Sequence, residues 1–115
     1  MSAQLHKFSE ITSEKKLEEY LIKKVKKLGG QTIKLSGPNQ RGVPDRIVIL
    51  PTNKIGFLEL KSKGKKPTKL QYHWLNELGS LGAVAEWTDS KYGVDIFIEL
   101  VQAIKSCEEC EFDLC

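Results

Sequence analysis

Two short apolar runs joined by a turn constrain the fold more than any other feature of this sequence. The runs are residues 45–50 (DRIVIL) and 55–60 (IGFLEL), and residues 51–54 between them carry turn-forming Pro and Asn. β-Branched and aromatic residues are frequent in both runs, and each run has the length of a strand rather than of a helix. They predict an antiparallel hairpin. Both runs are apolar at nearly every position, so we expect both faces to be covered.

The register of this hairpin brings two carboxylates together. If the turn centres on Thr52, residues whose numbers sum to 104 face each other, and Asp45 then lies opposite Glu59. Directly opposed Cβ atoms are about 5 Å apart, where like charges repel. Lys61 follows Glu59 by two positions and projects from the same face. A purely structural interpretation is that Asp45 caps a turn and Glu59 pairs with Lys61 at a sheet edge.

The three residues also suit a hydrolytic site. A divalent cation between Asp45 and Glu59 would remove both their repulsion and the cost of burying them. Carboxylate oxygens suit Mg²⁺ or Mn²⁺, which also bind substrate phosphate. Such an ion activates water, and Lys61 could hold that water or stabilise charge that develops on the phosphate. The constellation therefore predicts cleavage of a phosphodiester.

The charge distribution points to a polyanionic substrate. The chain has 18 basic and 15 acidic residues, and four of the acids lie in the last ten residues, which leaves 18 against 11 elsewhere. A basic patch attracts nucleic acid, although a solvated lysine-rich face gives the same composition. The side chains that we expect to contact DNA are Arg41, Arg46, Lys63, Lys65, Lys66 and Lys69.

The remaining elements complete an α/β pattern. Residues 13–28 predict an amphipathic helix that ends at Gly29-Gly30, and residues 31–35 a short strand. Thr68 is a suitable N-cap for a helix to about residue 78, which Gly79 to Gly82 would break. A strand at 83–87 and a helix at 94–106 follow. The order α-β-β-β-α-β-α describes a mixed β-sheet flanked by helices.

One carboxylate of the first helix is unusual. Glu18 lies among apolar positions of the helix, where a surface glutamate has no evident role. Glu14 lies one turn earlier on the same face, where an acid is favoured by the helix dipole alone. We therefore rank Glu18 ahead of Glu14 as a site residue.

The length of 115 residues fits one compact domain and leaves little room for two. Residues 1–12 form a polar lead-in without the apolar core of a secretory signal, and residues 107–115 form an acidic tail. All three cysteines lie in this tail, at Cys107, Cys110 and Cys115, and the first two have the CxxC spacing of zinc and redox sites. A structural zinc site normally needs four ligands, so we favour a tail with reduced thiols, and an intersubunit metal or disulfide contact is the alternative. We expect one domain over residues 13–106 and a soluble, cytoplasmic protein of a bacterial or phage-infected cell.

At these motifs the sequence resembles a known family. Residues 41–46 (RGVPDR), 57–61 (FLELK) and 67–71 (PTKLQ) are similar to the motifs of stand-alone VRR-NUC (virus-type replication-repair nuclease) domains of phages and bacteria. These domains belong to the PD-(D/E)xK nuclease superfamily, and the resemblance spans about residues 13–104. It implies a restriction-endonuclease-like core.

The resemblance also implies roles for individual residues. Asp45, Glu59 and the backbone carbonyl of Leu60 would bind Mg²⁺ or Mn²⁺, and Lys61 would be the catalytic lysine. Gln71 would lie near the scissile phosphate. Glu18 matches the helix glutamate that completes the metal site in junction-resolving relatives.

The implied activity is that of a DNA endonuclease in DNA repair, selective for branched DNA in the manner of a Holliday-junction resolvase. A homodimer is expected, because two symmetric nicks need two sites related by a two-fold axis. No organic cofactor is implied. The alternatives are a nuclease with little structure preference and a non-catalytic DNA-binding module of the same fold. A small-molecule metal hydrolase is less favoured, because it would usually supply histidine ligands.

Overall fold

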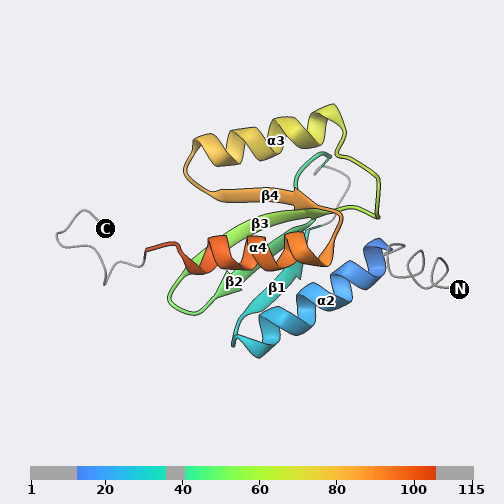
Figure 1. Ribbon diagram of the computed structural model, residues 1–115. Coiled ribbons are helices and arrows are strands. Elements are labelled where there is room, and N and C mark those ends of the chain that lie inside the picture. The colour runs from blue at the N-terminus through green and yellow to red at the C-terminus, as the bar shows by residue number, and fades with distance from the viewer. Residues whose placement is uncertain (1–12, 36–40, 106–115) are drawn as a thin grey trace, which may run out of the picture.

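Four strands form one sheet in the order β1-β2-β3-β4, with helices on both of its faces (Figure 1). A computed structural model describes residues 13–35 and 41–105. Its elements are α2 (Glu14–Lys27), β1 (Gln31–Lys34), β2 (Arg46–Leu50), β3 (Lys54–Leu60), α3 (Lys69–Ser80), β4 (Val84–Thr88) and α4 (Lys91–Gln102). β1, β2 and β3 pair antiparallel, whereas β4 is parallel to β3. The predicted order of elements and the mixed α/β sheet are confirmed.

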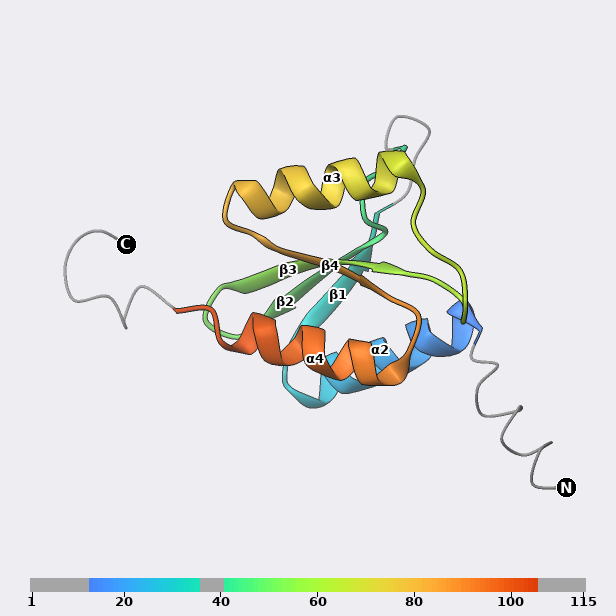
Figure 2. The same cartoon turned by 45° about the horizontal axis from the view of Figure 1, so that its top comes forward.

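The core lies on one face of the sheet. Figure 2 shows α2 and α4 against this face and α3 on the opposite one. The buried side chains come from both helices and the central strands: Leu17, Leu21, Val25, Val48, Leu50, Leu58, Leu60, Val94, Phe97, Ile98 and Val101. Their spacing along α2 is the helical periodicity visible in the sequence.

The other face is covered only in part. α3 packs against β4, and beyond it the side chains of Ile33 and Ile55 are 51% and 41% exposed. The expectation that both faces of the hairpin are covered is therefore wrong at the end near the turn. An apolar strand sequence predicts that the strand can be buried, but it does not predict how much of the sheet a single helix covers.

The predicted hairpin register is confirmed. Ile49 pairs with Ile55 and Ile47 with Phe57. Thr52 and Asn53 reverse the chain between the two strands with φ of 68° and 62°. Asparagine tolerates this left-handed conformation better than most residues.

Two helix boundaries differ from the prediction. α3 continues through Gly79 to Ser80, and the positive φ of 97° that ends it belongs to Gly82. α4 begins at Lys91 rather than at residue 94, because the Ser90 hydroxyl accepts a hydrogen bond from Gly93 N–H and caps the first turn. A Cβ at Gly93 would collide with the Thr88 hydroxyl, so this glycine permits the helix to start close to β4.

The remaining boundaries differ little. β4 begins at Val84, one residue later than predicted, and α4 ends at Gln102 instead of continuing to residue 106. The predicted lead-in and the cysteine-containing tail lie outside the described residues. None of the helices among residues 13–35 and 41–105 has the length and apolar character needed to cross a membrane.

Candidate active site

The two acidic residues of the hairpin meet where β2 begins and β3 ends. Arg46 pairs with Leu58, and the same register extended by one residue places Asp45 opposite Glu59. The Leu60 N–H donates to Asp45 Oδ1 over 3.4 Å, and the Asp45 carbonyl accepts from Leu35 N–H. Asp45 is thus held between the end of β1 and the end of β3, and its position opposite Glu59 is the one that the hairpin register predicted.

Glu59 is the centre of the cluster. It is only 5% exposed, and its Oε2 lies 3.3 Å from Lys61 Nζ and accepts a 3.1 Å hydrogen bond from Gln71 Nε2. Its Oε1 is buried and has no hydrogen-bond partner among the described residues. One carboxylate oxygen is therefore satisfied by the chain, and the other retains its capacity to bind a ligand.

The position of Gln71 follows from the start of α3. The sequence Thr68-Lys-Leu-Gln71 forms a capping box, in which Thr68 N–H donates to Gln71 Oε1 and Gln71 N–H donates to Thr68 Oγ1. Because the cap holds the amide oxygen, the amide nitrogen is turned toward Glu59. A local helix signal thus places a hydrogen-bond donor in the site.

Both carboxyls resist ionisation. Burial, and then the charge of Asp45, raises the pKa of Glu59 to about 7, although Lys61 acts in the opposite direction. Burial is also the main reason that the pKa of Asp45 is raised, and the charge of Glu14 raises it further. The site therefore holds more negative charge than Lys61 compensates, which is the electrostatic setting that a divalent cation stabilises.

The helix carboxylates occupy two different environments. The Glu18 carboxylate accepts from the Arg46 guanidinium and lies 3.7 Å from Lys34 Nζ. The hydrogen bond from Arg46 is the main reason that the pKa of Glu18 is lowered. By contrast, it is Glu14 whose charge acts on Asp45. Of the two helix carboxylates, Glu14, which ranked second in the sequence, is therefore the one whose charge opposes the ionisation of Asp45.

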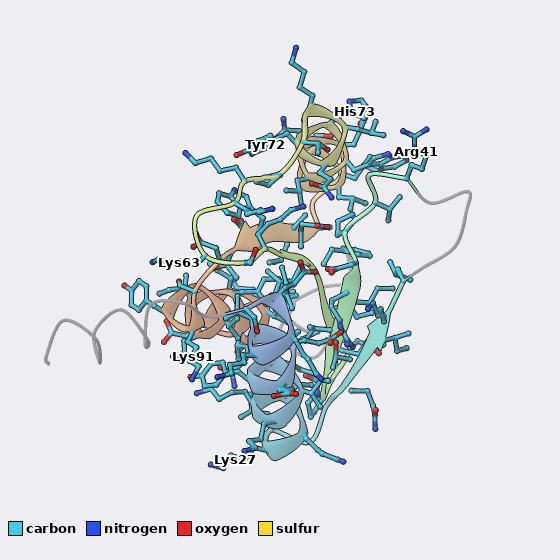
Figure 3. All side chains as sticks on the ribbon, turned by 90° about the vertical axis from the view of Figure 1, so that its right-hand side faces the viewer. Lys27, Arg41, Lys63, Tyr72, His73 and Lys91 are labelled. Atoms are coloured by element: carbon cyan, nitrogen blue, oxygen red, sulfur yellow. The ribbon has the colours of Figure 1, made fainter. Side chains whose placement is uncertain are left out.

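The residues expected to contact DNA also divide into two groups. Arg46 is only 7% exposed and turned toward Glu18, so its burial disfavours a contact with DNA. The other five side chains, those of Arg41, Lys63, Lys65, Lys66 and Lys69, are exposed. Figure 3 looks onto the site end of the sheet and shows Arg41 and Lys63 on opposite flanks of it.

The loop that carries the lysines is fixed to the fold. Gly64 N–H donates a 3.0 Å hydrogen bond to Asp89 Oδ2, in the segment between β4 and α4, and Lys65 N–H donates to the Ser62 carbonyl. Pro67 is buried at the end of the loop. The lysines are therefore presented from an anchored loop beside Lys61.

Within the described part of the chain, no three side chains of His, Cys, Asp or Glu are grouped so as to hold a metal by themselves. Asp45 and Glu59 would provide two carboxylates to such an ion. Mg²⁺ in nucleotide-processing enzymes is commonly bound in this way, by one or two carboxylates with waters and substrate phosphate.

Comparison with known proteins agrees with this arrangement. No family model matches the chain. A protein of Acyrthosiphon pisum secondary endosymbiont phage 1, named "Putative nuclease p44", is 45% identical over 69 residues, which cover 60% of this chain and 74% of the phage protein. A solved structure described as a VRR_NUC domain superposes with a TM-score of 0.69 at 34% identity and covers 76% of this chain and 96% of its own. The chain belongs to the VRR-NUC family of nucleases.

Proposed function

We propose that this protein is a metal-dependent DNA endonuclease with Asp45, Glu59 and Lys61 at its active site. The observation that carries the proposal is the buried Oε1 of Glu59, which has no partner among the described residues and lies in a carboxyl whose pKa is raised to about 7. An acidic residue in this state costs stability unless it binds a cation. The family and the phage relative support a nuclease as the enzyme class.

The donor set fits Mg²⁺ or Mn²⁺. Asp45 and Glu59 would hold the ion with the backbone carbonyl of Leu60, whereas the Glu18 carboxylate is engaged by Arg46 and is therefore less available as a ligand. Hard oxygen donors are the ligands that these ions prefer. When bound, the ion would supply positive charge at the scissile phosphate and lower the pKa of a water molecule.

The residues of the chain would do the positioning. Lys61 keeps 18% of its side chain exposed, so its ammonium group can donate to an attacking water or to a phosphate oxygen. Gln71 holds the Glu59 carboxylate through its amide, and the capping box holds Gln71. Lys63, Lys65 and Lys66 would bind neighbouring phosphates of the backbone.

The finer proposal is selectivity for branched DNA, such as a four-way junction, by a homodimer. Two symmetric nicks require two active sites related by a two-fold axis, and one chain carries one site. A nuclease with little structure preference is the alternative within the same class. A non-catalytic DNA-binding module is less favoured, because both carboxylates and Lys61 are present together.

The test is cleavage of labelled linear, flapped and four-way-junction DNA with Mg²⁺ or Mn²⁺. Lys61→Ala should reduce the rate by about two orders of magnitude or more, as expected for a group that acts on the reacting phosphate or water. Lys54→Ala, at the far end of the same strand, is the matched control and should cut as well as wild type. Sedimentation of the wild type measures its oligomeric state.

Each outcome separates the alternatives. Paired symmetric nicks in the junction that disappear in Lys61→Ala, together with a dimer in solution, would support the junction-resolving proposal. Equal cleavage of all three substrates would favour a nuclease with little structure preference. A Lys61→Ala variant as active as wild type would refute the assigned site, and binding without cleavage would favour the DNA-binding module.

A further inference from the structure

We propose that Tyr72 and Trp87 form a stacking site for an unpaired base of the DNA substrate, next to the scissile phosphate. This inference rests on the proposed function, and it names the feature of branched DNA that the protein would recognise. A flap, a gap or an open branch point offers such a base, whereas the bases of a linear duplex are stacked on their neighbours.

The aromatic pair lies beside Glu59. In the parallel pairing of β3 and β4, Trp87 is the partner of Glu59, and both side chains meet the first turn of α3. Glu59 accepts a hydrogen bond from Gln71 of this turn. Tyr72 is the next residue of the helix, and the centre of its ring lies 6.5 Å from that of Trp87. A base held by these two rings would therefore lie next to a phosphate at the candidate active site.

A cleft of about 400 Å³ opens beside the two rings, between α3 and the edge strand β4. On the α3 side it is lined by Leu75, Asn76 and Gly79, which lie on the same helix face as Tyr72. A Cβ at Gly79 would meet no atom within 4 Å, so this end of the cleft is open. The volume is in the range of sites that bind small organic molecules.

The chemistry of the cleft suits a base rather than a phosphate. Among the described residues that line it there is no lysine or arginine, although 18 of the 115 residues of the chain are basic. Asn76 and Glu86 contribute exposed polar side chains. An amide and a carboxylate can pair with the donors and acceptors at the edge of a base.

The geometry of the rings leaves room for stacking. The Tyr72 ring stands at 88° to that of Trp87, and Tyr72 is 38% exposed. In such an edge-to-face pair the ring that presents its edge has neither of its faces covered by the other ring. Stacking on an aromatic face accepts any base, so the site would select for an unpaired base without reading its sequence.

The structural alternative is that the pair only attaches α3 to β4. Tyr72 would then contribute to stability and not to the choice between DNA structures. The two roles therefore predict different effects of the same substitution.

The test measures binding of a flapped duplex and of a linear duplex with the same number of phosphates, by anisotropy in EDTA. Tyr72→Leu should weaken binding of the flapped duplex about tenfold, within the range for loss of one base–aromatic stack, and leave the linear duplex unchanged. Tyr72→Phe retains the ring and should bind both as wild type does. Tyr92→Leu is the matched control, because Tyr92 is 75% exposed on α4, at the opposite face of the sheet (Figure 2).

An abasic nucleotide identifies the base that is bound. Flaps with one abasic nucleotide at successive positions from the branch point should include a position that weakens wild-type binding about tenfold. The same position should cost Tyr72→Leu nothing further, because the base and the ring are the two halves of one contact. Thermal unfolding shows whether each variant folds, and the abasic series with wild-type protein still tests the site if Tyr72→Leu does not.

Three results would overturn the stacking site. They are equal binding of both duplexes by wild type, unchanged or equally weakened binding of both by Tyr72→Leu, and a series in which no abasic position matters. Failure of the proposed function would look different. A wild-type protein that prefers flapped DNA through Tyr72 but cleaves nothing with Mg²⁺ or Mn²⁺ would refute the nuclease and keep the site. Cleavage that depends on Lys61, with unchanged DNA choice in Tyr72→Leu, would refute the site alone.

Discussion

The substitution Glu59→Gln tests the electrostatics of the site directly. The pKa of Glu59 is about 7 in the folded protein, against 4.5 for an ordinary glutamate. Because the folded state holds this proton more tightly than the unfolded state, the free energy of unfolding should fall as pH rises from about 4.5 through 7. Below that window the carboxyl is protonated in both states and costs nothing.

The magnitude follows from the shift. A difference of about 2.5 pKa units corresponds to about 3 kcal/mol of stability lost above pH 7 when metal is absent. Glu59 is 5% exposed, so little of this is screened by solvent. The pKa of about 7 for Glu59 already includes the attraction to Lys61, so this attraction is not counted a second time. The raised pKa of Asp45 acts with the same sign, whereas the lowered pKa of Glu18 affects stability only at more acidic pH.

Urea unfolding in EDTA between pH 5 and pH 8.5 measures the effect. Glu59→Gln keeps the shape of the side chain and an oxygen that can accept from Gln71, so it should be more stable than wild type at pH 8 by up to about 3 kcal/mol. At pH 5 the two proteins should differ little. Glu99→Gln, at an exposed position on α4, controls for the loss of one surface charge.

Mg²⁺ or Mn²⁺ should restore the stability of the wild type at pH 8 and leave that of Glu59→Gln almost unchanged. The reasoning fails if the wild type shows no loss of stability between pH 5 and pH 8 in EDTA. It fails equally if Glu59→Gln retains the full pH dependence, since the loss would then arise elsewhere in the chain.

Two further predictions concern the loop and the core. Exchanging three loop lysines for Gln should make the negative slope of log K against log salt for duplex DNA shallower by about 2 to 3, at about 0.9 per phosphate contact. Anisotropy titrations measure this slope, and an unchanged slope would exclude the loop from the DNA-binding surface. The lysines are Lys63, Lys65 and Lys66. Gly56→Ala should destabilise the fold by about 1–3 kcal/mol in thermal unfolding, because its Cβ would lie 2.6 Å from Val101 and 2.9 Å from Phe97. Gly79→Ala is the control on α3, because a Cβ at this position would meet no atom within 4 Å. It should be neutral or stabilise the fold by up to about 1 kcal/mol. Equal effects at both glycines would contradict this account of the packing.

Local sequence determined the hairpin register, the position of Lys61 and the start of α3. The pattern of residues 45–60 fixed a hairpin whose register pairs Asp45 with Glu59, because side chains alternate along a strand and the turn sets which residues are opposed. Period-two spacing placed Lys61 beside Glu59, and the capping box of Thr68 and Gln71 started α3. These features depend on contacts between residues that are close in the chain or opposed across one turn.

Packing between distant elements determined the rest. Which strand residue each carboxylate of α2 meets depends on the rotation of the helix over the sheet, and in this fold Arg46 of β2 donates to Glu18. α4 begins early because Gly93 fits against Thr88. A helical pattern states which residues share a face but not which strand residue each one meets. The motifs of the chain therefore predicted a nuclease site. Only the tertiary structure decided that Arg46 is buried and that one oxygen of Glu59 has no hydrogen-bond partner in the described part of the chain.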